Sequence, residues 1–105
     1  MINQKNIDKA LAKAKLLKEV LEKIKEANAS TAASIDREIG FISKWMEGLN
    51  SGSDERLNAV WQEVQPISKM MDNIYEPKQL STKKDKLINE FWEAMRDVAV
   101  DLRRN

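Results

Sequence analysis

The sequence predicts an all-α protein, and three observations support this fold class. Glycine and proline, which disfavour helix interiors, occur only three times and twice in 105 residues. Hydrophobic residues make up 42% and charged residues 33% of the chain, a balance typical of long amphipathic helices. The hydrophobic residues recur at spacings of three and four, which is the helical period. At this length we expect a single helical domain spanning residues 1–105.

The first helix is expected over residues 5–28. Asn3 or Asn6 can cap its start, because a short polar side chain accepts a hydrogen bond from the free N–H groups of the first turn. Its end is expected near Asn28, since the Ala-Ser-Thr segment that follows carries side chains that compete for backbone hydrogen bonds. The apolar face of this helix consists of Ile7, Leu11, Ala14, Leu17, Leu21 and Ile24.

Two more helices are expected over residues 32–49 and 54–75. The Asn-Ser-Gly-Ser segment between them contains a glycine suited to positive φ, followed by Ser53 in position to cap the later helix. Pro66 removes a backbone donor and clashes with the preceding turn, so we expect a kink near Val64. The apolar face of the earlier helix consists of Ile35, Ile39, Ile42, Met46 and Leu49.

The last helix is expected over residues 82–103. Pro77 ends the preceding helix, and Ser81 or Thr82 then caps the new one, with Asp85 at the capping-box position. The four expected helices have similar lengths, and the loops between them are short. We therefore predict an antiparallel up-down four-helix bundle in which the first and last helices are neighbours.

An alternative architecture follows from the phase of the first two helices. Their apolar residues share one lattice with a period of about 3.5 residues, so residues 5–49 could form one long helix. The chain would then be a long helical hairpin. Such a hairpin must dimerise into an intermolecular four-helix bundle to bury its apolar faces.

Aromatic and glycine positions add to the predicted packing. Trp45, Trp61 and Trp92 each follow an apolar residue by four positions, so we expect their rings to pack in the core. Gly40 and Gly48 lie inside the second expected helix, where each costs about 1 kcal/mol relative to alanine. Glycines in that position typically allow a close approach of another helix or lie near a helix end.

The chain contains no histidine and no cysteine, which removes most catalytic and metal-binding chemistry. Metal sites in helical bundles usually combine inward glutamates with Glu-x-x-His pairs, which a chain without histidine cannot form. The sequence also lacks a glycine-rich phosphate loop. We therefore expect no enzymatic activity, no metal and no cofactor. Among the acids that have close acidic neighbours, Glu38 and Asp97 are the first to examine for burial.

Charge is unevenly distributed along the chain, although the net charge is only +1. Residues 1–28 contain seven lysines and four acids, and residues 77–105 contain seven basic and five acidic side chains. Residues 53–76 are acidic, with five acids and two bases. In the predicted bundle, the two basic helices share one side, to which the Lys83-Lys84-Asp85-Lys86 cluster also contributes.

The first helix also carries a second, mixed face. Leu16 and Val20 lie away from its main apolar stripe, and Lys9 and Lys13 flank them. We hypothesise that these four residues bind another protein, with the apolar side chains supplying affinity and the lysines steering the approach. The expected function is that of a non-enzymatic helical module, such as a small adaptor, inhibitor or assembly subunit. The alternative is a sequence-independent nucleic-acid binder that uses the same basic face of the first and last helices.

A third hypothesis comes from the segment Trp45-Met46-Glu47-Gly48 before the mid-chain loop. This segment is similar to the Trp-x-Gly turn of the small helical-hairpin proteins that the type VII secretion pathway exports. That resemblance implies an exported helical-hairpin dimer. The spacing here is Trp-x-x-Gly, however, and the tyrosine-led acidic export signal is not found near the C-terminus.

The expected location follows from the same composition. Residues 1–18 mix charges throughout and lack the apolar block of a signal peptide, and no uncharged stretch is long enough to span a bilayer. The lack of cysteine favours a reducing compartment. We therefore expect a soluble cytoplasmic protein, with secretion without a cleavable signal, and homodimerisation, as alternatives.

Overall fold

The computed structural model describes residues 2–67 and 77–104, and within these ranges it contains helices and short connections but no strand. The predicted all-α class is therefore confirmed. No helix in these two ranges has the length and apolar character needed to cross a lipid bilayer. The elements are α1 (Gln4–Ala27), the short 3-10 helix η1 (Ala29–Thr31), α2 (Ala32–Asn50), α3 (Asp54–Val64) and α5 (Lys78–Arg104).

Asparagines stand at both ends of α1. The side chain of Asn3 accepts a hydrogen bond from the backbone N–H of Lys5 at 2.9 Å, so the predicted cap is confirmed. Asn28 has extended backbone, with φ −144° and ψ 94°, and its side chain accepts from the backbone N–H of Ser30. This extended residue separates α1 from α2. The alternative of one long helix, and with it the long hairpin, is therefore wrong.

The turn between α2 and α3 forms as the sequence predicts. Gly52 has a φ of +70°, a value that residues with a side chain rarely adopt. The hydroxyl of Ser53 accepts from the backbone N–H of Arg56 and caps α3. Asp54 and Glu55 follow in the first turn, where the helix dipole favours negative charge.

The end of α3 differs from the prediction. The helix ends at Val64, where a kink was expected, and the backbone N–H of Gln65 still bonds to the carbonyl of Trp61. Pro66 follows immediately and cannot donate the next helical hydrogen bond. The rest of the helix predicted up to residue 75 lies, from residue 68 onward, outside the described residues.

The start of α5 lies one turn earlier than predicted. The carbonyl of Pro77 accepts hydrogen bonds from the backbone N–H groups of Leu80 and Ser81, so the helix already begins at Lys78. The expected caps are wrong for this reason: Ser81 and Thr82 lie inside the helix, and Ser81 is buried.

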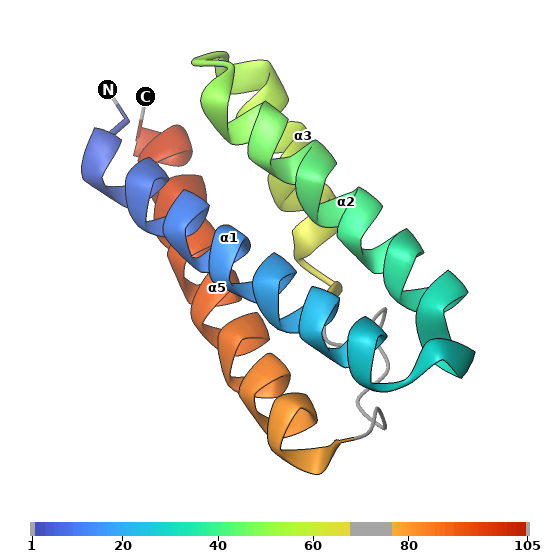
Figure 1. The fold of residues 1–105 in the computed structure, drawn as a ribbon. Helices are drawn as coiled ribbons and strands as arrows, with labels where there is room; N and C mark the ends of the chain where they lie inside the picture. Colours follow the sequence, from blue (N-terminus) through green and yellow to red (C-terminus); the bar gives the residue numbers. More distant parts are fainter. Residues whose placement is uncertain (1, 68–76, 105) are drawn as a thin grey trace.

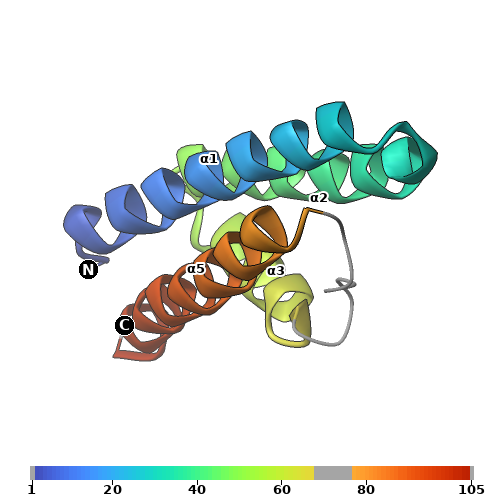
Figure 2. The ribbon, with the colours of Figure 1, turned by 60° about the horizontal axis from the view of Figure 1, so that its bottom comes forward.

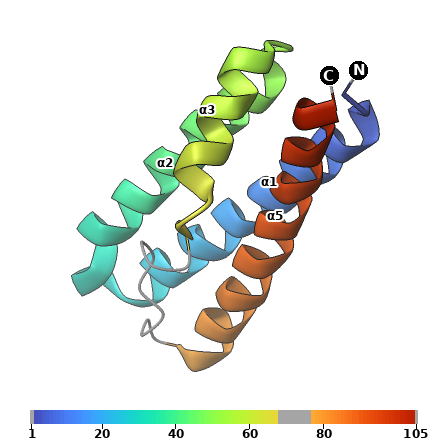
Figure 3. The ribbon, with the colours of Figure 1, turned by 180° about the vertical axis from the view of Figure 1, so that it is seen from behind.

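The described helices pack in a closed ring of contacts, in which α1 contacts α2 and α5, and α3 contacts the same two helices. Figure 1 shows α1 and α2 side by side and running in opposite directions. Figure 2 shows that α1 and α2 form one layer and that α3 and α5 form the other. Seen from behind, the shorter α3 lies between α2 and α5 (Figure 3). The predicted contact between the first and last helices is confirmed, and the molecule measures 44 × 21 × 20 Å.

The two chain ends lie at the same end of the molecule (Figure 1). The carboxylate of Asp101 on α5 accepts a hydrogen bond from the side-chain amide of Asn6 at 2.8 Å and another from the backbone N–H of Asn3 at 3.2 Å. The start of α1 is therefore hydrogen-bonded to the last turns of α5.

One hydrophobic cluster draws on α1, α2, α3 and α5. At its centre the rings of Trp45 and Phe91 stack at a centroid distance of 5.9 Å, which joins α2 and α5 across the ring of helices. Trp45 and Trp61 are buried as predicted, whereas Trp92 is half-buried and donates its indole N–H to the carbonyl of Gln65.

The buried face of α2 is rotated relative to the prediction. Ile39 and Met46 are only half-buried, because the stripe that faces the core passes through Trp45 instead. Its buried members are Ile35, Glu38, Ile42, Trp45, Gly48 and Leu49.

Gly48 brings α2 and α3 together. A Cβ atom at this position would collide with Cγ2 of Val60, so the close approach of the two helices requires glycine. A Cβ atom at Gly40, on the exposed side of the same helix, would meet no other atom.

Candidate functional site

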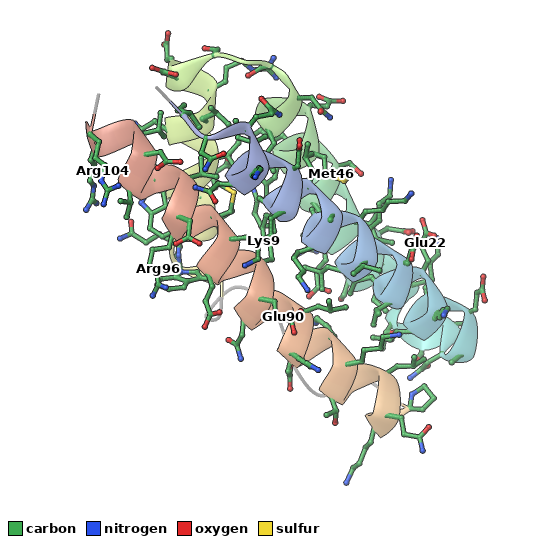
Figure 4. The ribbon with its side chains drawn as sticks, turned by 90° about the vertical axis from the view of Figure 1, so that its left-hand side faces the viewer. Lys9, Glu22, Met46, Glu90, Arg96 and Arg104 are labelled. Carbon is green, nitrogen blue, oxygen red and sulfur yellow. The ribbon has the colours of Figure 1, made fainter. Side chains whose placement is uncertain are left out.

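The lysines expected to bind a partner lie along the line where α1 packs against α5. We name this surface the α1–α5 seam and define it as Lys9, Lys13 and Leu16 of α1 with Lys86 and Glu90 of α5. Figure 4 shows Lys9 and Glu90 on the same side of the molecule, beside the boundary between the two helices. At the centre of the seam, Nζ of Lys13 donates a hydrogen bond to Oε2 of Glu90 at 2.7 Å.

Three ammonium groups surround the single carboxylate of the seam. The hydrogen bond from Lys13 lowers the pKa of Glu90 below its ordinary value of 4.5, and the charges of Lys13, Lys86 and Lys9 lower it further. Glu90 is therefore ionised at neutral pH. By its definition the seam contains three lysines and one glutamate.

Leu16 supplies the apolar part of the seam. It follows Lys13 by three residues, which places the two side chains next to each other on one side of α1. Its side chain is 42% exposed, and the only other exposed large hydrophobic residue in the described ranges is Val100 on α5.

Val20, the fourth predicted site residue, is not part of this surface. Its side chain is 2% exposed and belongs to the core. The main stripe of α1 drifts along a helix of this length, so that at Val20 the second face has turned toward the interior together with Leu17, Leu21 and Ile24. Val20 was therefore wrongly assigned to an accessible ridge.

Lys84 was also wrongly placed, in the basic surface cluster at the start of the last helix. Its side chain is fully buried and lies next to the carboxylate of Glu38 on α2, a residue that is only 7% exposed. Nζ of Lys84 is 3.3 Å and 3.4 Å from the two carboxylate oxygens of Glu38. Glu38 is thus buried, and it pairs with an ammonium group.

The sequence does contain a signal for this buried pair. Glu38 stands three residues after Ile35 and four before Ile42, and Lys84 stands three before Leu87. Both residues therefore occupy positions on an apolar stripe, where a charged side chain must find an opposite charge or leave the interior.

The other acid to be examined, Asp97, is half-buried. In residues 2–67 and 77–104, no group of three or more acids is arranged to hold a metal ion.

A surface hollow of about 380 Å³ lies between the start of α3 and the end of α5. The acids Asp54 and Glu55 line it together with Arg103, so charges of both signs are present. Trp61 and Leu102 contribute the apolar part of its wall. Nothing in the sequence indicates this hollow, because its walls come from two helices whose relative position depends on packing.

Arg96 and Arg104 extend the basic character of α5 beyond the seam (Figure 4). The guanidinium group of Arg96 lies over the ring of Trp92 at 5.6 Å from its centroid, a cation–π contact. Comparisons of this chain with protein-family models, with curated proteins and with solved structures find no match.

Proposed function

We propose that this protein is a non-enzymatic binding module that docks another protein on the α1–α5 seam. The observation that carries the proposal is Leu16, an exposed leucine beside Lys13 in a seam that holds three lysines and one glutamate. Charged groups at a surface steer a partner, while covered apolar groups supply affinity. Covering the remaining exposed part of Leu16 contributes about 1 kcal/mol.

The architecture supports a surface of this kind. We propose an antiparallel up-down four-helix bundle. Its apolar stripes are buried in the core, and the outer faces of α1 and α5 are exposed and available for binding. Two long helices packed side by side present a rigid surface. Binding to such a surface costs little conformational entropy, because the module is already ordered.

The proposal can be tested by crosslinking. A photoreactive amino acid at position 16 is expected to crosslink a partner in cells of the source organism. The same amino acid at position 15, which is exposed but outside the seam, serves as the matched control. A partner captured equally from both positions would contradict the proposal.

Charge reversal tests the lysines separately. The double variant Lys9→Glu with Lys13→Glu is expected to lose the partner. Lys15→Glu with Lys78→Glu makes the same change in net charge at exposed positions outside the seam and is expected to retain it. If the seam variant retains every partner, this surface does not bind.

The alternative of a nucleic-acid binder makes a different prediction. It requires binding to duplex DNA that weakens steeply with salt, since each phosphate contact releases counterions. If such binding is found and depends on Lys9 and Lys13, it replaces the protein-binding proposal. Homodimerisation would give a dimeric mass in sedimentation, whereas the proposed module is a monomer.

A further inference from the structure

Lys13 and Glu90 form an ion pair at the centre of the seam, where a binding partner has access to both side chains. The two side chains are 27% and 30% exposed, and their 2.7 Å hydrogen bond faces the outside of the molecule at the boundary between α1 and α5. Ion pairs at such positions stabilise a protein only weakly, because water solvates both charges when they separate. Each group can therefore exchange its partner.

We propose that the seam binds a segment of another protein that carries several carboxylates, and that in the free protein Glu90 occupies the place of one of them. This inference rests on the proposed function and specifies its partner. The position of Glu90 shows that a carboxylate fits beside Lys13. An arriving carboxylate takes this place, and the side chain of Glu90 turns outward into water.

The charge of the seam explains why one carboxylate is not enough. Lys9, Lys13 and Lys86 all act on Glu90, so three positive charges face one negative charge. A segment with two or more carboxylates neutralises Lys9 and Lys86 in addition to Lys13. A hydrophobic residue within the same segment can then cover Leu16, a contact that a chain of phosphates does not make.

The internal carboxylate thus competes with the partner and sets its affinity. Removing the charge of Glu90 leaves the place beside Lys13 open and removes a repulsion between Glu90 and the arriving acids. For one exchanged surface ion pair, we expect affinity to rise roughly threefold. The increase should shrink as salt is added, since salt screens exposed charges.

The test uses a synthetic peptide of six glutamates around a central leucine, titrated into the ¹⁵N-labelled full chain and followed by NMR. The wild-type protein is expected to show chemical-shift changes centred on residues 9–16 and 86–90. Glu90→Gln is expected to bind the peptide roughly threefold more tightly than the wild-type chain. Lys9→Gln is expected to bind it more weakly.

Glu93→Gln is the matched control. Glu93 is an exposed acid three residues further along α5, and it makes no ion pair within the described residues. Glu93→Gln therefore removes one negative charge, as Glu90→Gln does, without removing a salt bridge. If Glu93→Gln raises the affinity as much as Glu90→Gln, bulk charge explains the gain and the inference about Glu90 is overturned. A cooperative thermal unfolding transition in each variant verifies that it is folded.

Two further outcomes separate this inference from the proposed function. If the acidic peptide does not bind while position 16 still crosslinks a cellular protein, the carboxylate-rich partner is excluded and the docking surface stands. If the acidic peptide does not bind and position 16 crosslinks no cellular protein, both proposals fail. Tighter binding of a DNA duplex than of the peptide would overturn the inference in favour of a nucleic acid.

Discussion

α5 makes two lysine–glutamate pairs with other helices, one in the interior and one at the seam. Lys84 is fully buried and lies 3.3 Å from the carboxylate of Glu38. Lys13 and Glu90 meet at 2.7 Å, where water reaches both side chains. The chemical groups are the same. In the interior, separating them would leave charges without water, and at the seam water replaces either partner.

The same two chemical groups therefore have different consequences at two places along one helix. The interior pair constrains how α2 and α5 face each other, because any arrangement that separates the charges is strongly disfavoured. The seam pair is partly exposed and imposes a much weaker constraint, and in the proposed function it gives way to a partner.

Replacing Lys84 with methionine should destabilise the protein by about 3–5 kcal/mol, since Glu38 then remains in the interior without that ammonium group. Urea unfolding monitored by circular dichroism measures the loss. Lys83→Met, at the neighbouring exposed position, is the control and should change stability by less than about 0.5 kcal/mol.

A double variant, Glu38→Leu with Lys84→Met, sharpens this result. It removes both charges together with their desolvation, so most of the lost stability should return. If the double variant is less stable than Lys84→Met alone, the two residues do not act on each other as a pair.

The two glycines of α2 extend the contrast between interior and surface. Gly48→Ala should destabilise the protein by about 1–2 kcal/mol, because the new methyl group meets Val60 and this clash outweighs the gain in helix propensity. Gly40→Ala adds the same atom where space is open and should stabilise the protein by about 0.5–1 kcal/mol. Equal effects in thermal unfolding would mean that α3 does not approach α2 as closely as described.

Glu90→Gln should lower stability at neutral pH by less than about 1 kcal/mol, as expected for a surface pair. The folded pKa of Glu90 lies below its ordinary 4.5, so its contribution is complete above pH 4.5 and disappears as pH falls through the lower folded pKa. Denaturation series of the variant and the wild type from pH 7 to pH 2 should therefore converge at the acid end. A difference that persists at pH 2 would point to lost packing.

The smallest effect is expected at Asp101, which lies in the last turn of α5. The hydrogen bonds from the Asn6 side chain and the Asn3 backbone lower the pKa of Asp101 below 3.8, with Arg104 adding to the shift. The stabilisation is present above pH 3.8 and is lost as pH falls through the folded pKa. Asp101→Asn should remove this part of the acid dependence of unfolding. Amide hydrogen exchange in the first turn of α1 should rise, and unchanged exchange there would contradict the role of Asp101.

Much of the local structure could be predicted from the sequence. The caps at Asn3 and Ser53, the glycine turn at Gly52 and the packing of Trp45 follow from short-range backbone chemistry and helical spacing. Where a prediction failed locally, as at the start of α5, the Pro77 carbonyl offered an earlier acceptor than the expected caps.

The helical class, the starts of most helices and the lysines beside Leu16 on α1 follow from the amino-acid order alone. The burial of Val20 and Lys84 follows from helix packing. So do the contacts of Lys84 with Glu38, 46 positions apart, and of Lys13 with Glu90, 77 positions apart. The reason is physical. Caps and periodicity act within a few residues, whereas the rotation and relative shift of packed helices come from the simultaneous packing of every side chain in the core.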